Sequence, residues 1–111
     1  MATVTEIAPD VYRLTAFNDA ANFQFSSFLV KDDEPLLYHT NLKGFFPDIL
    51  EAAAGVLDPA TIRWIGFSHF ESDECGSLND WLARAPNAEP VCSFVGARTS
   101  VEDFSDRSPR V

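Results

Sequence analysis

The most informative part of this sequence is the stretch Gly66-Phe67-Ser68-His69-Phe70-Glu71-Ser72-Asp73-Glu74-Cys75-Gly76-Ser77-Leu78. Four potential metal ligands lie within six residues of it: His69, Glu71, Asp73 and Glu74. The first three alternate, so an extended backbone would direct their side chains to one side. Glu74 breaks this period, and we expect a backbone turn there, for which Gly76 supplies conformational freedom. The stretch predicts a loop that directs several ligands to one point.

Both flanks of this loop have the patterns of regular secondary structure. Before it, Ile62–Phe67 is a short, mostly apolar run, which is typical of a strand covered on both faces. After it, apolar residues recur at helical spacing from Leu78 to Ala85, and Pro86 ends the segment. A strand, a ligand-bearing loop and a helix in this order indicate α/β layering.

The rest of the chain extends this pattern. The sequence predicts strands at Val11–Thr15, Phe23–Val30, Leu36–His39 and Pro90–Phe94, an amphipathic helix at Phe46–Leu57 and a short helix at Gly96–Asp103. The polar residues 105–111 are predicted to form a tail. With 111 residues, 46% of them hydrophobic, the chain is long enough for one domain with a buried core.

Composition and charge exclude several classes of function. The net charge is −9 and there is no basic run, which argues against binding to nucleic acid or to anionic lipid. No apolar run approaches the length that spans a bilayer. Cys75 and Cys92 lack CxxC spacing, and Met1–Thr15 does not resemble a secretory signal, so we expect a cytoplasmic location.

Each ligand candidate also has an ordinary structural interpretation. Ser72 or Asp73 can cap the helix that begins near Leu78, and glutamates in a loop are usually solvated. His69 can be a hydrogen-bonded histidine at a strand end. The clustering of all these residues directly after a buried strand favours a metal site over these separate explanations.

The loop resembles that of the metallo-β-lactamase superfamily, which places a His-x-His-x-Asp-His motif between a buried strand and a helix. In this sequence Glu71 and Glu74 stand where that motif has its second and last histidines. Flavodiiron proteins and their flavodoxin-free relatives, the oxygen-binding di-iron proteins, also carry glutamate at the middle position. The likeness to the latter group continues through Trp81-Leu82 and Pro90-Val91-Cys92-Ser93 to Asp103-Phe104.

The resemblance implies a fold, a ligand set and a cofactor. Residues 1–104 would be the N-terminal half of an αββα sandwich, a mixed β-sheet with helices on one face, followed by the polar tail 105–111. His69 and Glu71 would bind one iron, and Asp73 with Glu74 the other. A later histidine, a bridging aspartate and a final histidine, which the family supplies from the second half of its fold, would complete the site.

Three functional hypotheses follow. Carboxylates are hard ligands that stabilise oxidised iron, so the first is a di-iron protein that binds or reduces dioxygen and receives electrons from a separate protein. The second is a zinc-dependent hydrolase of esters or thioesters, although zinc hydrolases favour histidine-rich sites. The third is an inactive fragment that binds metal weakly and self-associates, as homodimers or aggregates, through the face meant for its missing sheet. His39 is expected to be a structural or merely nearby polar residue. Cys75 is expected to pack under the loop, and a role for it as a thiolate ligand lies outside the family pattern.

Overall fold

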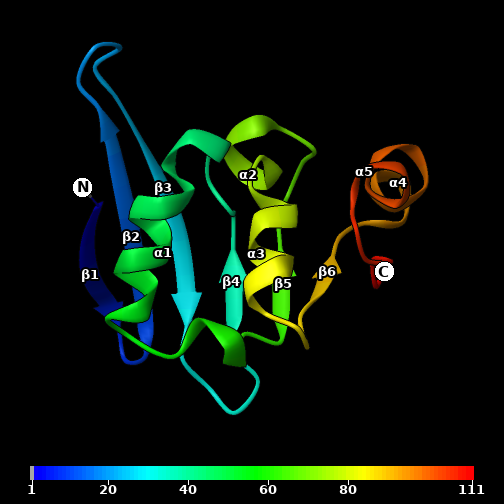
Figure 1. The fold of residues 1–111 in the computed structure, drawn as a ribbon, viewed down its shortest axis with the longest axis horizontal. Coiled ribbons are helices and arrows are strands. Elements are labelled where there is room, and N and C mark those ends of the chain that lie inside the picture. Colours follow the sequence, from blue (N-terminus) through cyan, green and yellow to red (C-terminus); the bar gives the residue numbers. More distant parts are fainter. Residues whose placement is uncertain (1) are drawn as a thin grey trace.

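The computed structural model describes residues 2–111, which form a six-stranded sheet with helices on one face (Figure 1). The strands are β1 Ala2–Ala8, β2 Val11–Asn18, β3 Phe23–Val30, β4 Leu36–Tyr38, β5 Trp64–Gly66 and β6 Glu89–Val91. The α-helices are α1 Phe46–Ala54, α2 Ser72–Cys75, α3 Leu78–Arg84, α4 Phe94–Gly96 and α5 Glu102–Phe104. Short 3-10 turns lie at Lys43–Phe45 and Pro59–Thr61, and a π-helical turn at Ala97–Val101 joins α4 to α5.

The sheet is mixed, and its strands follow chain order. Strands β1 to β4 are antiparallel neighbours, whereas β4, β5 and β6 run parallel to one another. Leu37 of β4 pairs with Leu29 on the antiparallel side and with Ile65 on the parallel side, and all three are fully buried. Strand β4 therefore joins an N-terminal meander to a parallel βαβ arrangement, in which helices form the crossovers.

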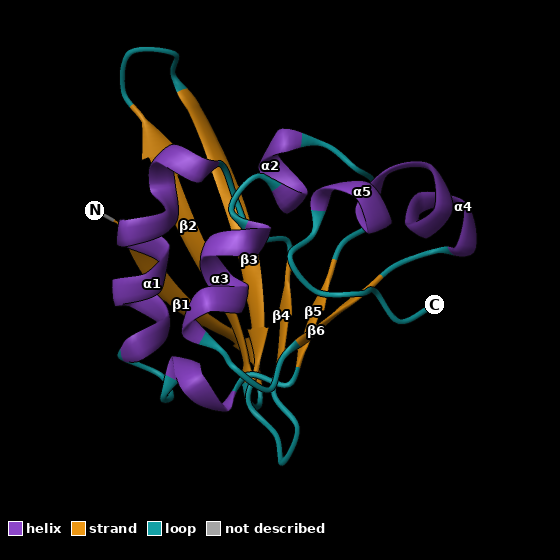
Figure 2. Cartoon of the chain, turned by 45° about the vertical axis from the view of Figure 1, so that its right-hand side comes forward, coloured by secondary structure: helices purple, strands orange, loops and turns teal. Residues whose placement is uncertain are grey.

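The helices α1 and α3 cover one face of this sheet (Figure 2). Ile49 and Ala53 of α1 and Trp81 of α3 are fully buried, and the ring of Trp81 meets Phe46 edge to face at 5.4 Å. These contacts confirm the prediction of an α/β fold with a mixed sheet and helices on one face. Within residues 2–111, none of the helices is long and apolar enough to cross a membrane.

The opposite face of the sheet carries half-buried apolar side chains. Because side chains alternate along a strand, Leu36 and Tyr38 lie on the face opposite the buried Leu37. Together with Trp64 they line a hollow of about 570 Å³. This face has the composition of a surface that packs against another layer.

Several elements differ from the sequence-based predictions. Strand β1 was not predicted: it is an edge strand with mostly exposed side chains, so its sequence lacks the pattern of a buried strand. Helix α1 ends at Ala54 rather than at Leu57. Phe94, which was predicted to end a strand, instead begins α4, where the Ser93 hydroxyl accepts a hydrogen bond from the Gly96 backbone.

Residues 105–111 contact the body of the domain. The Arg107 guanidinium donates to the backbone carbonyls of Leu82, Ala85 and Ala88, which lie at the end of α3 and just after it. Arg110 pairs with Glu89 of β6 at 3.0 Å. The boundary at residue 104 that the resemblance implies stays a prediction.

A buried polar joint connects the end of β4 to α2. The Thr40 backbone donates to the Glu74 carbonyl at 2.6 Å, and the Ser77 hydroxyl donates to the Thr40 carbonyl at 2.7 Å. Thr40 and Ser77 are fully buried. Gly76 lies within this joint, where a Cβ would collide with the Ser72 carbonyl and approach the Lys43 nitrogen to 3.3 Å. Gly76 adopts an ordinary helical conformation with φ −59°, so close packing and not backbone freedom requires glycine.

The Gly76→Ala variant should therefore be destabilised by about 1–3 kcal/mol, as for other overpacked sites. Gly44→Ala is the matched control, because a Cβ at Gly44 meets nothing within 4 Å. Urea unfolding of both variants measures the difference. Equal stability of the two variants would contradict the close packing described for the joint.

Candidate metal centre

The loop after β5 changes conformation part-way along. Glu71 is extended, with φ −123° and ψ 153°, and Ser72 then begins the single turn of α2. The Glu74 backbone donates to the Glu71 carbonyl at 2.9 Å, which closes this turn. Residues three apart in a helical turn lie on the same side, so Glu71 and Glu74 come together while Asp73 does not join them.

Glu74 holds the loop from inside. Its Oε1 accepts hydrogen bonds from the backbone amides of Ser68, at 2.8 Å, and His69, at 2.7 Å. The residue is only 6% exposed. A buried carboxylate that accepts two backbone N–H bonds fixes the path of the chain where His69 leaves the strand.

Three of the four predicted ligands form a cluster. His69 Nδ1 lies 3.6 Å from Glu74 Oε2 and 3.8 Å from Glu71 Oε1. Ligand atoms of these three residues all lie within 4.8 Å of one another. Asp73 is half-buried on α2 and is not part of this group. The assignment of one iron to His69 with Glu71 and of another to Asp73 with Glu74 stays a prediction.

The two glutamates of the cluster titrate differently. The hydrogen bond to Glu74 is the main cause that raises the pKa of Glu71, and burial and the neighbouring negative charges act in the same direction. Burial alone would raise the pKa of Glu74, but the His69 amide, the bond with Glu71 and the proximity of His39 together lower it. Two carboxylates in contact favour either a shared proton or a bound cation.

His39 is a neighbour of the cluster that the sequence did not assign to the site. It follows β4 with a positive φ of 67°, and its Nε2 lies 3.2 Å from Glu74 Oε1. Its ring stacks on Tyr38, with centroids 4.5 Å apart, and the Tyr38 hydroxyl bonds to Ser68 beside the loop. Periodicity places His39 only at a strand end, so the sequence held no signal for this contact.

Sequence comparisons find diflavin and flavo-diiron proteins among the relatives of this chain. Diflavin flavoprotein A 1 of Nostoc sp. is 36% identical over 78 residues, which are 70% of this chain and 13% of that protein. Flavo-diiron protein FprA2 of Clostridium acetobutylicum is 31% identical over 72 residues, or 65% of this chain and 18% of that protein. The chain thus spans less than a fifth of the curated relatives it matches. No protein-family model matches the chain.

Solved structures show the same fold. A flavo di-iron protein mutant from Thermotoga maritima superposes with a TM-score of 0.87 at 21% identity, covering 100% of this chain and 32% of that one. A metallo-β-lactamase from Cronobacter sakazakii gives a TM-score of 0.74 at 21% identity, and the superposition covers 97% of this chain and 43% of that protein. The chain therefore has the fold of the metallo-β-lactamases and of the flavo di-iron proteins. Its sequence relatives include flavodiiron proteins.

In this metallo-β-lactamase fold, the cluster has a donor set that fits a transition metal. It combines one imidazole with two carboxylates. This set suits iron better than zinc, because zinc hydrolases favour histidine-rich sets. The buried Nε2 of His39 makes no hydrogen bond within residues 2–111, although it lies beside the cluster. The residues therefore fit a bound cation.

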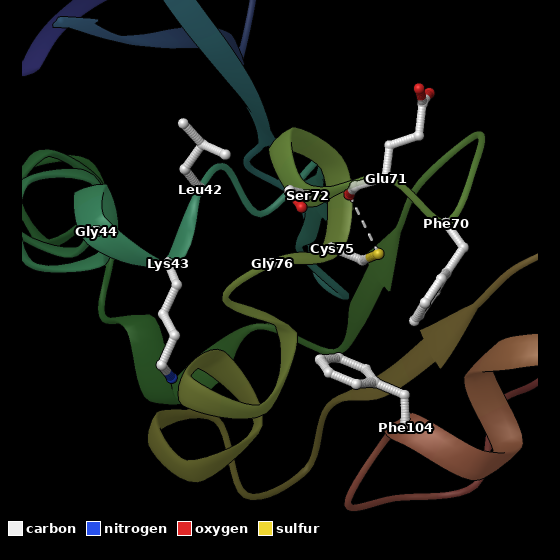
Figure 3. Close-up of a pocket in the computed structure, with 9 residues that line it drawn as sticks. All are labelled: Leu42, Lys43, Gly44, Phe70, Glu71, Ser72, Cys75, Gly76 and Phe104. Carbon is white, nitrogen blue, oxygen red and sulfur yellow. Dashed lines mark hydrogen bonds between the residues drawn. The ribbon is translucent and has the colours of Figure 1, made fainter.

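A cavity of about 510 Å³ lies on the other side of the loop after β5 (Figure 3). Phe70 and Phe104 meet edge to face across it at 5.3 Å, while the Glu71 side chain points away from it. The Cys75 thiol donates to the Glu71 carbonyl at 3.3 Å, and burial raises the pKa of this thiol to about 11. Cys75 packs under the loop as a protonated thiol, so it is not a ready thiolate ligand.

The Glu74→Gln variant tests the anchoring role of the carboxylate. Replacing a charged acceptor of two backbone bonds should lower the free energy of unfolding by roughly 2 kcal/mol. Glu71→Gln is the matched control, because the Glu71 side chain is 63% exposed, and it should change stability by less than about 0.5 kcal/mol. Urea unfolding at neutral pH measures both.

The pH dependence of stability provides a second measurement on the same pair. Because the folded state lowers the pKa of Glu74, its stabilisation is present above the ordinary glutamate range and is lost as pH falls through the folded value. Glu74→Gln should therefore flatten the acid side of the stability profile. A profile unchanged by this substitution would show that Glu74 does not anchor the loop.

Proposed function

We propose that the chain binds iron through His69, Glu71 and Glu74 and belongs to a di-iron protein that reacts with dioxygen or nitric oxide. The observation that carries this proposal is the cluster itself, with ligand atoms of all three residues within 4.8 Å of one another. An imidazole and two carboxylates on one loop form a hard, anionic set that stabilises ferric iron. Bound iron would supply redox chemistry and an open position for a diatomic ligand.

The relatives support this class of chemistry through their names. Some of the sequence relatives are named anaerobic nitric oxide reductase flavorubredoxins. One of them, from Pectobacterium carotovorum, is 27% identical over 79 residues. One structural neighbour is named a rubredoxin oxygen:oxidoreductase, from Desulfovibrio gigas, with a TM-score of 0.85. For this chain we propose dioxygen or nitric oxide as the ligand and a separate electron-transfer protein as the donor.

The chain's own residues have distinct tasks in this proposal. Glu74 keeps the loop in place through Oε1, which leaves Oε2 facing His69. Glu71 projects from the extended part of the loop and is exposed, so its carboxylate can swing onto an incoming ion. We propose that Asp73 serves a second ion, together with the later ligands that the family resemblance implies.

Zinc-dependent hydrolysis is the alternative within the same superfamily. The metallo-β-lactamase from Cronobacter sakazakii shares the fold at 21% identity, and this likeness concerns the fold alone. Glu71 and Glu74 in place of two histidines leave a single imidazole in the cluster, which is poorer in nitrogen than zinc hydrolase sites. The donor set therefore favours iron.

Metal uptake under anaerobic conditions tests the proposal. Ferrous iron and zinc are offered to the protein in competition, and bound metal is measured by elemental analysis. His69→Ala should lose more affinity than the roughly 10–100-fold that loss of an outer-shell partner costs, because it removes the imidazole ligand. Asp103→Asn is the control, since this exposed acid lies on α5 outside the cluster. It should bind iron as the parent does.

Each outcome has a defined meaning. Iron binding that depends on His69, with a change in visible absorbance on adding oxygen or nitric oxide, supports the proposal. Preference for zinc with ester hydrolysis would replace it by the hydrolase alternative. Absence of any uptake would refute metal binding by this chain.

A further inference from the structure

The environment of His39 is unusual for a structural histidine. Its Nε2 is buried and makes no hydrogen bond within residues 2–111, although the side chain as a whole is 23% exposed. The nearest acidic atom is Glu74 Oε1, at 3.2 Å. That oxygen also accepts two backbone N–H bonds, from Ser68 and His69, and its contact with Nε2 is not a hydrogen bond. A buried polar nitrogen without a partner requires an explanation.

The orientation of this imidazole is set by contacts other than the one to Glu74. The His39 backbone donates to the Gly66 carbonyl at 2.8 Å and adopts a left-handed conformation that residues with a Cβ rarely take. The ring lies on Tyr38 at an interplanar angle of 24°. Strained backbone of this kind gathers at functional sites, because the surrounding structure must hold it in place.

The distance between Nε2 and Oε1 matches that of two atoms bound to one ion. Ligand bonds of about 2.0–2.2 Å to a transition metal place neighbouring ligand atoms about 3.0–3.5 Å apart in tetrahedral or octahedral sites. The observed 3.2 Å falls within this interval. An ion held between the imidazole and the Glu74 carboxylate would give Nε2 the partner that it lacks.

We propose that His39 is a further ligand of the metal centre, coordinating through Nε2 beside the Glu74 carboxylate. The centre then draws on two elements, the end of β4 and the loop after β5. His39 faces Oε1 of Glu74 and His69 faces Oε2, so His39 adds a second imidazole beside the cluster of His69, Glu71 and Glu74. This inference rests on the metal binding proposed above and adds a ligand that the HFESDE loop does not contain.

The composition of the chain makes the test direct, because His39 and His69 are its only histidines. Long-range proton–nitrogen correlation spectra of the ¹⁵N-labelled protein resolve the imidazole nitrogens of both. Titration with Zn²⁺, used as a diamagnetic probe, should shift one nitrogen of each ring in parallel, and His69→Ala identifies the signals of His39. This measurement leaves His39 itself unsubstituted.

Substitutions at His39 provide the second arm. If His39 only positions Glu74 by a polar contact, His39→Gln should retain that contact and bind Zn²⁺ and Fe²⁺ as the parent does. If His39 is a ligand, both His39→Gln and His39→Ala should weaken binding by at least about tenfold, in calorimetric or chelator-competition titrations. Circular dichroism and urea unfolding confirm that each variant is folded.

The outcomes separate this inference from the proposed function. If zinc shifts the imidazole nitrogen signals of His69 alone, and His39→Gln binds metal as tightly as the parent, His39 is not a ligand. That result would leave the proposed metal centre intact. Zinc and iron that do not bind at all would overturn both proposals. Parallel shifts of both histidines with loss of affinity in His39→Gln would establish the ligand.

Discussion

The buried carboxylate of Glu74 is the constraint on which the rest of the structure depends. Its Oε1 receives the amides of Ser68 and His69, and its backbone carbonyl receives the amide of Thr40. One residue therefore ties the end of β4, the loop after β5 and the turn of α2 together. Burying a charged group is costly unless it is hydrogen-bonded, so these donors are what allows the acid to lie there.

The same arrangement links the fold to its chemistry. Because Oε1 accepts the two backbone amides, Oε2 is directed to the side where His69 and Glu71 lie. Two adjacent carboxylates and an imidazole with few competing hydrogen bonds form a site whose negative charge is best balanced by a cation. The proposed metal centre is therefore a consequence of how the loop is anchored, and a change of metal loading is expected to act on loop stability as well.

Much of the architecture was predictable because it rests on patterns of burial. The apolar run before the loop and the helical spacing after it led to β5 and α3, and the period of the segment beginning at Phe46 led to α1. The exposed edge strand β1 was missed because no face of it is consistently buried. Hydrophobic periodicity reports burial, so it says little about elements that bury little.

The candidate site was only partly predictable, for reasons of backbone conformation. An extended loop would have aligned Asp73 with His69, but the helical turn at Ser72 brings Glu74 into the cluster in its place. His39 reaches Glu74 because one residue after β4 adopts a positive φ. Such single-residue conformations depend on tertiary contacts, for instance the packing of Tyr38 against His39, and not on the local spacing of apolar residues.

Native-state hydrogen exchange of the Ser68 and His69 amides tests the central role of Glu74 most directly. Both residues are exposed, yet their amides are predicted to exchange more than about tenfold more slowly than in an unstructured peptide, because they bond to a buried carboxylate. The Glu74→Ala variant should lose this protection. Exchange of both amides at the unstructured rate in the parent protein would contradict the anchored loop, and with it the geometry of the proposed metal centre.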